Sequence, residues 1–518
     1  MSCRHDNLEK ISKLGNSRMR NLKKLYLPIT AFLILIAGPA QGFEEKSISI
    51  GSKAFTESVI LGEIASFLLK ADGVPNVHRR QMGGTRILWN ALRRGDIDVY
   101  PEYTGTIRQE IYAGKKSLTD PLSLKQALAR DGIGMSSPLG FANNYALGMT
   151  AVRAKELNVS RISQLSKIQN LQLGFSNEFL DRSDGWSSLK RVYNFKTRDA
   201  QGLDHDLAYR ALSQGLLDVT DLYTTDAEIS YYKLRTLEDD LNHFPSYEAV
   251  YLYRLQRASQ LPLLKSLGRI AGKISAIEMA GLNKMVKIEK KSESDVASHF
   301  LKEKIFLQTE TNSQNLYQRI IRSTGEHLWL VMLSMLAAII LAVPLGVYSF
   351  WHETPGQLVL GISGIVQTIP GLAMLVFMIP IFGIGAFPTI AALFLYSLLP
   401  IVRNTYTGLK GIDKSLTEAA KMFGLSRLSC LIHIQLPLAL PIIITGIKTS
   451  AVINIGTATL GAIIGAGGYG QPILTGIRLD NVSLILEGAI PAAAMAIATQ
   501  YLFELLEKRR SKLGKIKK

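Results

Sequence analysis

The feature of this sequence that most constrains its fold is a series of long apolar segments between Leu328 and Leu506. Five of them come near the roughly 20 apolar residues that a helix needs to cross a bilayer. They lie at about 328–350, 358–380, 384–402, 436–464 and 482–506. Residues 43–325 are, by contrast, charged and typical of a soluble domain. The 518-residue chain is therefore predicted to divide near residue 320 into a soluble part and a membrane-spanning part.

The distribution of positive charge predicts how the apolar segments are oriented. The net charge is +17, and basic residues cluster in the first 24 and the last eleven positions. Lys and Arg residues that flank apolar spans mark the cytoplasmic side, so this pattern favours a membrane protein over a nucleic-acid-binding one. With the C-terminus inside, five crossings place residue 325 outside the cytoplasm. The fourth segment is long and glycine-rich, and a re-entrant turn within it would change the count.

The N-terminal region supports the same orientation. A short apolar stretch from Leu25 to Ala40 follows a basic stem and ends in small residues, which is typical of a signal peptide cut near 40–42. An uncleaved anchor helix is the alternative, and both interpretations export the soluble part. The two cysteines, Cys3 and Cys430, lie outside the soluble part, which excludes a structural disulfide within it.

A motif lies between the third and fourth apolar segments. Glu418-Ala419-Ala420 is followed by Gly424 and then by Ile434-Gln435-Leu436-Pro437. The pattern resembles the EAA loop of ABC-importer permeases, EAA-x3-G-x9-I-x-L-P, with every spacing met. The resemblance implies that 414–437 is a cytoplasmic loop through which an ATPase drives transport, with an ordinary helical hairpin as the alternative.

The local sequence of this loop predicts a helix–turn–helix. Helix formers extend from Lys414 to Phe423, and Gly424 suits a turn that needs a positive φ. A second helix is expected from Ser426 to Gln435, before Pro437 opens the next span. Such a compact unit can transmit a rigid push between two proteins.

Further segments extend the resemblance over both parts of the chain. The membrane part looks like the permease of osmoprotectant importers, which handle glycine betaine, choline or carnitine, at Gln367–Pro370, Leu395–Tyr406 and Gly465–Gly468. The soluble part looks like the solute-binding subunits of the same importers at Gly51–Glu57, Tyr100–Thr106, Gly140–Tyr145, Tyr223–Asp226 and Phe244–Tyr247.

The expected fold class follows from this resemblance and from the patterning. Residues 47–305 alternate short β-like runs with helical stretches, which suggests an α/β fold with parallel sheets. We therefore expect an α/β two-lobed periplasmic-binding-protein domain (type II-like), followed by an all-α transmembrane permease domain of about five helices. The chain is expected to cross between the lobes near Leu147–Thr150 and Pro245–Arg254.

The expected cargo needs an aromatic site. A trimethylammonium group cannot donate a hydrogen bond, and a cation over a ring face gains about 0.5–2 kcal/mol. The family uses tyrosines, and its motifs carry over to Tyr103, Tyr145, Tyr223 and Tyr247, with Thr106 and Asn143 as polar neighbours. For any single tyrosine, core packing is the alternative.

The other end of a betaine is a carboxylate, which needs donors. Thr56 and Ser58 lie on the first loop, although some relatives have glutamine where Ser58 stands. Arg86 is a candidate for a bidentate clamp, or else a solvated helix residue.

Other functions are excluded or kept as alternatives. No G-x-x-x-x-G-K-[ST] loop is present, so ATP and Mg²⁺ are expected on a separate ATPase chain. No catalytic residue, metal site or cofactor is expected in this chain, nor any nucleic-acid partner. The favoured function is the receptor and permease of an importer for quaternary-ammonium osmolytes, paired as a homodimer in the inner membrane. One alternative is the same architecture with another zwitterion such as ergothioneine, and another is a membrane-anchored ligand sensor.

The expected domain boundaries are as follows. They are a signal peptide or anchor at 1–42, a solute-binding domain at 43–305, a linker at 306–324, a permease domain at 325–509 with its EAA loop at 414–437, and a basic cytoplasmic tail at 510–518.

Overall fold

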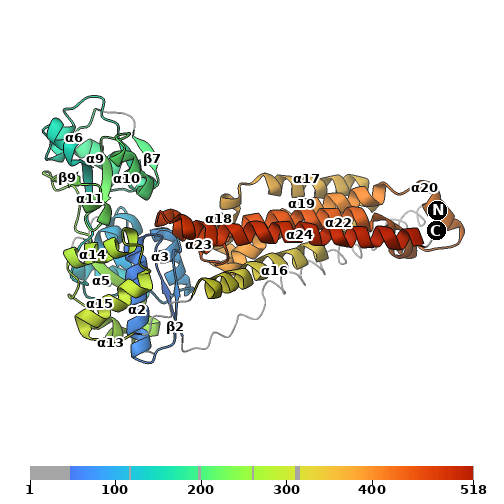
Figure 1. Cartoon of the computed structure of the whole chain (residues 1–518), viewed down its shortest axis with the longest axis horizontal. Helices are drawn as coiled ribbons and strands as arrows, with labels where there is room; N and C mark the ends of the chain where they lie inside the picture. The colour runs from blue at the N-terminus through green and yellow to red at the C-terminus, as the bar shows by residue number, and fades with distance from the viewer. Residues whose placement is uncertain are drawn as a thin grey trace, which may run out of the picture.

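The computed structural model describes residues 47–115, 118, 120–196, 200–258, 262–309 and 315–516, the last eight of these by backbone only. The predicted leader at 1–42 lies outside the described residues. Within them, a soluble α/β domain sits at one end of an elongated bundle of helices (Figure 1). The two parts of the chain meet near α23, and α20 lies at the opposite end of the bundle.

Lobe one of the soluble domain is built on a five-stranded sheet of order β2-β1-β3-β10-β4. Its strands are β1 (Ile48–Gly51), β2 (Asn76–Arg79), β3 (Val99–Tyr103), β4 (Ile133–Met135) and β10 (Ala249–Arg254). Its helices are α2 (Thr56–Ala71), α3 (Thr85–Arg94), α4 (Thr104–Thr106) with a π-helix at Ile107–Ile111, α5 (Pro121–Arg130), α12 (Leu255–Ala258), α13 (Leu263–Gly268), α14 (Ala276–Lys287) and α15 (Glu293–Ile305). Helix α2 is buried along most of its length because other helices cover its outer side as well.

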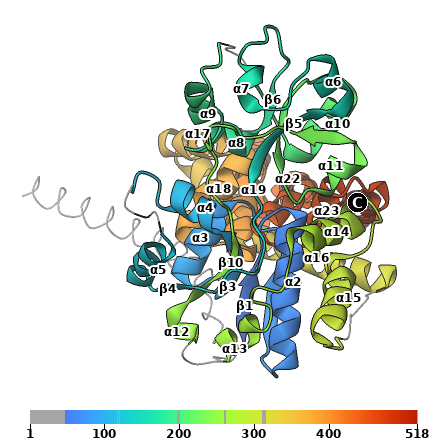
Figure 2. The ribbon, with the colours of Figure 1, turned by 90° about the vertical axis from the view of Figure 1, so that its left-hand side faces the viewer.

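Lobe two contains a three-stranded sheet of order β8-β5-β9 and a separate pair, β6-β7. Its strands are β5 (Tyr145–Thr150), β6 (Gly174–Ser176), β7 (Gln201–Leu203), β8 (Thr220–Tyr223) and β9 (Leu234–Thr236). Its helices are α6 (Ala151–Glu156), α7 (Ile162–Leu165), α8 (Asn177–Asp181), α9 (Trp186–Val192), α10 (His205–Ser213) and α11 (Ala227–Tyr231). Figure 2 shows this lobe above lobe one, with α11 facing α14 where the lobes meet.

The two-lobed α/β architecture is confirmed, but two details of the prediction are wrong. The pairing is mixed: β1 runs parallel to β2 and β3, whereas β10 runs antiparallel to β3 and β4. Strand β10 enters lobe one from the side of lobe two, so its direction is opposite to that of β3. The first crossing also lies before Tyr145, because β5 already belongs to the second sheet.

The membrane domain consists of long apolar helices with a short helical loop at each end. They are α16 (Leu316–Trp351), α17 (Glu353–Thr368), α18 (Gly371–Phe382), α19 (Ala386–Lys410), α20 (Lys414–Met422), α21 (Arg427–Cys430) with a π-helix at Leu431–Gln435, α22 (Leu436–Thr457) with a 3₁₀-helix at Ala458–Ile464, α23 (Gly470–Arg478) and α24 (Val482–Ile516). Helix α16 begins inside the predicted linker, and α24 continues into the predicted tail.

About five membrane spans were expected, and the described residues contain four suitable helices, or up to five if a bent pair is one span. The bent pair is α17 and α18, which meet at 103° within the second apolar segment. Pro370 explains the break, because proline lacks an N–H and forces the preceding Ile369 into an extended conformation. The all-α membrane domain is thus confirmed.

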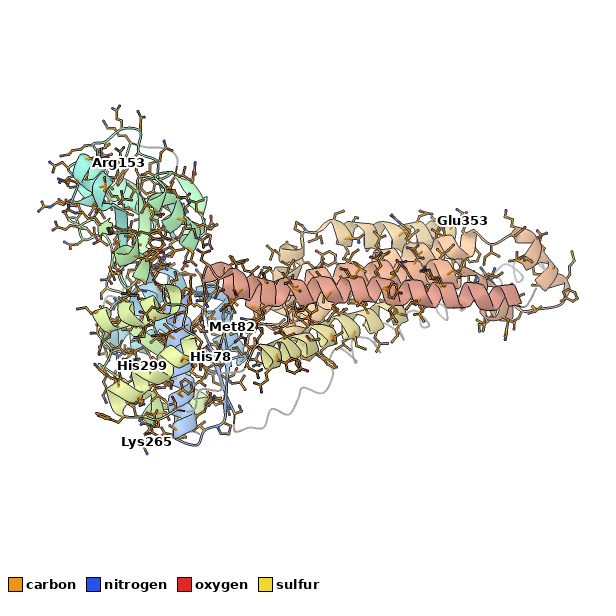
Figure 3. All side chains as sticks on the ribbon, viewed as in Figure 1. His78, Met82, Arg153, Lys265, His299 and Glu353 are labelled. Carbon is orange, nitrogen blue, oxygen red and sulfur yellow. The ribbon has the colours of Figure 1, made fainter. Side chains whose placement is uncertain are left out.

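The EAA loop forms the expected helix–turn–helix. Asp413 caps α20 by accepting a hydrogen bond from the Ser415 amide at 2.9 Å, and Gly424 ends the turn with a φ of +75°. Ser426 then caps the second helix through the Ser429 amide at 3.1 Å. Figure 3 places Glu353 toward this end of the bundle, whereas Met82 lies in lobe one of the soluble domain, near the opposite end of the bundle.

Candidate functional site

The first two candidate tyrosines face each other across a pair of strands. Tyr145 begins β5 and Tyr223 ends β8, and they are direct partners in the antiparallel register. Directly opposed residues in such a pair have neighbouring side chains. Their ring centroids are accordingly 4.9 Å apart at 67°, and their hydroxyls are 3.2 Å apart.

The other two tyrosines come from the ends of other segments. Tyr247 lies just before β10, with its ring centroid 5.5 Å from that of Tyr145. Tyr103 ends β3 and joins through Phe55, whose centroid is 6.2 Å from both Tyr103 and Tyr223. The structure therefore brings together one aromatic cluster, consisting of Phe55, Tyr103, Tyr145, Tyr223, Phe244 and Tyr247.

A guanidinium group lies against this cluster. The Cζ atom of Arg182 is 5.0 Å from the ring centroid of Tyr145 and 5.7 Å from that of Tyr247. Asp184 holds it through two hydrogen bonds of 2.9 Å, and Thr106 Oγ1 is 3.5 Å from Nη1. The aromatic faces are thus arranged to stabilise a cation.

A second cation lies on the lobe-one side of the cluster. The Nζ atom of Lys53 is 5.6 Å from the ring centroid of Tyr103 and 2.5 Å from a carboxylate oxygen of Glu102. Both side chains of this ion pair are almost fully buried. Two positive charges therefore border the aromatic cluster, one from each lobe.

The buried carboxylate of Glu57 orients part of the aromatic cluster through hydrogen bonds. Glu57 Oε1 accepts hydrogen bonds from the Tyr103 hydroxyl at 2.6 Å and from Asn143 Nδ2 at 3.1 Å. Its Oε2 accepts from Thr225 Oγ1 at 2.5 Å and from Asn283 Nδ2 at 3.1 Å. Burial raises the pKa of Glu57 above its usual range, against the lowering effect of the Thr225 and Tyr103 hydrogen bonds. This carboxylate links lobe one to lobe two and fixes the orientation of Tyr103.

The predicted carboxylate-binding residues are not all gathered at the aromatic cluster. Thr56 Oγ1 accepts a hydrogen bond at 2.6 Å from Arg478 of the membrane domain. Ser58 Oγ accepts from the Lys53 amide at 2.8 Å within its own loop. Arg86 is exposed and its Nε lies 3.7 Å from Glu110, which is also 3.4 Å from Arg182. Thr106 and Asn143 do border the cluster, as expected from the sequence.

Comparison with known proteins assigns both parts of the chain. Residues 46–303 match the substrate-binding domain of ABC-type glycine betaine transport systems, and residues 333–512 match the inner membrane component of binding-protein-dependent transport systems. A glycine betaine/carnitine/choline permease of Bacillus subtilis is 43% identical over 195 residues, covering 38% of this chain and 90% of that protein. The chain belongs to this family of ABC importers.

A second permease relative agrees with this assignment. An osmoprotectant import permease of Salmonella typhimurium is 42% identical over 189 residues, covering 36% of this chain and 88% of that protein. A solved glycine betaine/carnitine/choline ABC transporter structure has 29% identity and a TM-score of 0.43, covering 49% of this chain and 98% of that one. The importer chain thus combines the receptor, which is the soluble domain, with the permease, which is the membrane domain. It is a multi-pass inner-membrane transport subunit whose family works with an ATPase partner.

The EAA loop of this importer is exposed at the tip of the bundle. Met422 and Phe423 are 87% and 86% exposed, although both are large and apolar, and Glu418 and Ala419 are exposed beside them. Ala420 is buried, and its carbonyl accepts from the Leu425 amide at 3.1 Å, which closes the turn at Gly424. Pro437 lies in the first turn of α22, where proline is tolerated.

Sequence reasoning missed three charged residues of the candidate site. Glu57 ends the segment Gly51–Glu57, but the sequence of that segment did not show that four hydrogen-bond donors converge on its carboxylate. Lys53 stands in the same segment. No sequence pattern pointed to Arg182, because its contacts with Tyr145 and Tyr247 depend on how the lobes meet.

Among the described residues, no group of three or more His, Cys, Asp and Glu side chains is placed to hold a metal ion.

Proposed function

We propose that the cargo of this importer is a zwitterionic quaternary-ammonium compound, a betaine such as glycine betaine or carnitine, bound at the aromatic cluster. The observation that carries the proposal is the position of Arg182, whose guanidinium lies over two tyrosine rings within a set of six aromatic side chains. Ring faces that accommodate one cation suit another, and a trimethylammonium group is recognised by such faces.

The two bordering cations favour a betaine over choline. Arg182 and Lys53 approach the cluster from opposite lobes, and Asp184 and Glu102 offset their charges. A carboxylate on the ligand can accept charge-assisted hydrogen bonds from one or both cations, and choline has no group that can do so. Thr106 Oγ1 accepts from Arg182 Nη1 at 3.5 Å, and its hydroxyl hydrogen can be donated to a ligand. Ergothioneine shares the betaine chemistry and stays a candidate within this class.

The EAA loop is proposed as the contact with the ATPase. Its exposed apolar residues Met422 and Phe423 need a partner surface, and Glu418 stands one helical turn away from Met422. ATP and Mg²⁺ bind on that partner in this proposal.

We also propose that two chains pair through their permeases. Within the chain, only 6% of the apolar part of α24 is buried, which leaves a large surface for a second copy and for lipid.

Titration of the purified full-length chain tests the proposed cargo. Glycine betaine, carnitine, ergothioneine and choline are added in turn, and binding is followed by calorimetry. We expect saturable binding of at least one carboxylated betaine, with choline weaker. Preferential binding of choline contradicts the zwitterion proposal, and binding of none of the four contradicts the quaternary-ammonium proposal altogether.

Deletion of the partner ATPase distinguishes an importer from a ligand sensor. Uptake by an importer should be abolished, whereas a sensor would keep its response to the ligand.

A further inference from the structure

The C-terminal end of α23 and the turn that follows it are where the permease contacts the receptor most closely. This segment consists of Arg478, Leu479 and Asp480, called here the docking turn. Figure 1 shows α23 at the end of the bundle that faces the soluble domain. A neighbouring contact joins Gln81 Nε2 of lobe one to Thr475 Oγ1 of α23 at 3.0 Å.

The first half of the docking turn is held by lobe one. Arg478 donates from Nη1 to Thr56 Oγ1 at 2.6 Å and from Nη2 to Glu293 Oε1 at 2.5 Å. The side chains of Arg478 and Glu293 are each only 7% exposed. Lys290 donates to the carbonyl of Leu479, whose side chain is buried in the receptor core.

The second half of the turn is held by lobe two. Asp480 Oδ1 accepts from Arg210 Nη2 of α10 at 2.7 Å. Asp480 has a φ of +49°, a left-handed conformation that reverses the chain at this point. Neighbouring side chains of opposite charge are thus paired with different lobes, a basic one with lobe one and an acidic one with lobe two.

This arrangement depends on how close the lobes are. Contacts that hold the lobes together include Lys287 of α14, which pairs with Asp206 and Glu228 of lobe two. A rotation of lobe two away from lobe one would separate Arg210 from Asp480 and leave the Arg478 contacts with Thr56 and Glu293 intact.

We propose that the docking turn reports receptor closure to the permease: Arg478 keeps the permease on lobe one, and Asp480 engages lobe two only when the lobes are closed. The inference rests on the import function above and adds how the loaded receptor is recognised. It also places one end of the turn beside the site, because Thr56 precedes Glu57, which accepts from Tyr103 and from Thr225 of lobe two.

Two cysteine pairs test this geometry without any ligand. In the full chain with Cys3 and Cys430 replaced by alanine, Arg210→Cys/Asp480→Cys reports the lobe-two contact. The matched pair Gln81→Cys/Thr475→Cys reports the lobe-one contact. Both are treated in native membranes with a short bifunctional thiol cross-linker, with and without Lys287→Glu, which reverses one charge of the contact between the lobes.

We expect Lys287→Glu to lower cross-linking of the lobe-two pair about fivefold or more and to leave the lobe-one pair unchanged. Unchanged cross-linking of the lobe-two pair, or an equal loss from both pairs, overturns the inference. Because this arm uses no betaine, its outcome is separate from the titration that tests the proposed cargo.

A charge reversal tests the consequence for transport. In proteoliposomes with the partner ATPase, Asp480→Arg should lower the glycine betaine-stimulated ATPase rate about fivefold, the effect of an exposed ion pair, and glycine betaine affinity should fall by no more than the same factor, because ligand and Asp480 both favour the closed state. Adding Arg210→Asp should restore the rate. Arg153→Asp is the matched control, since Arg153 pairs with Asp218 inside lobe two at its far side (Figure 3). An Asp480→Arg variant with the wild-type rate overturns the inference.

Discussion

The guanidinium carbon of Arg182 lies 5.0 Å from the ring centroid of Tyr145, so the receptor's own cation rests on an aromatic face of the candidate site. Asp184 balances its charge through two hydrogen bonds of 2.9 Å. A betaine that places its ammonium on this face must therefore share the ring with Arg182 or displace it. A guanidinium displaced from the ring would be free to donate charge-assisted hydrogen bonds to the carboxylate of the ligand.

The first prediction concerns the ring of Tyr145. Tyr145→Ala removes a face that stabilises a desolvated cation by about 1–2 kcal/mol, so the Kd for glycine betaine should rise about fivefold to thirtyfold. Tyr145→Phe keeps the ring and loses only the hydroxyl contact with Tyr223, so its Kd should change much less. Titration calorimetry measures both. Tyr231→Ala, at an exposed tyrosine of lobe two, is the control, and equal affinities for the alanine variant and the wild type would exclude the aromatic site.

The second prediction concerns selectivity. Arg182→Gln removes a charge-assisted donor worth about 1.5–3 kcal/mol, so glycine betaine should bind about tenfold to a hundredfold more weakly. Choline has no carboxylate that could lose a donor, and the substitution leaves the negative charge of Asp184 without this partner, so choline affinity should stay the same or increase. Competition titrations give the ratio of the two affinities. A parallel loss for both ligands would show that Arg182 only maintains the structure, and Arg161→Gln provides an exposed control in the same lobe.

The third prediction is a pH dependence from His205, which packs against Tyr223 with ring centroids 4.4 Å apart. Burial alone lowers the pKa of His205, but its interactions with Asp221 and Asp226 outweigh this and raise the pKa well above its usual 6.5. A raised pKa in the folded state stabilises the protein below pH 6.5, and this contribution is lost as the pH rises through the folded-state pKa. His205→Gln should therefore lower the Tm most at pH 6 and progressively less in alkaline solution. Differential scanning fluorimetry from pH 6 to 10 tests this, and a constant Tm difference would contradict it.

The fourth prediction concerns the turn of the EAA loop. Gly424 has a φ of +75°, and a Cβ atom there would meet no atom within 4 Å, so only the backbone opposes a side chain. A branched residue in this conformation costs about 1–2 kcal/mol. Gly424→Val should therefore lower ligand-stimulated ATPase activity and leave ligand binding intact, while Gly424→Asn should retain more activity. Gly361→Ala in α17 is the control, since it has equally open space and a helical backbone. Full stimulation by the valine variant would contradict a rigid turn.

The architecture was largely predictable from the sequence because its signals are local. Apolar length indicates a span wherever it occurs, and Gly424 has its positive φ for reasons contained within a few residues of chain. The bend between α17 and α18 was less predictable, since a run of apolar residues does not reveal whether the helix continues straight or turns. Strand direction was also misjudged at β10, because it depends on the chain's return from lobe two.

The candidate site was predicted in part. The four tyrosines are gathered as expected, because each stands in a segment that ends at the junction of the lobes. Thr56 and Ser58, by contrast, hydrogen-bond to Arg478 and to the Lys53 backbone. Which donors face the aromatic rings depends on contacts between residues far apart in the chain, such as Arg182 and Tyr247.

The sequence by itself determined that this chain crosses a membrane and carries an exported two-lobed receptor, and it predicted a loop for contact with an ATPase, because hydrophobic length, charge placement and motif spacing act locally. Only the tertiary structure decided which charges border the aromatic cluster and that Arg478 and Asp480 reach different lobes. These relations depend on packing between distant segments, and pairing of charges across such distances leaves no periodic pattern along the chain.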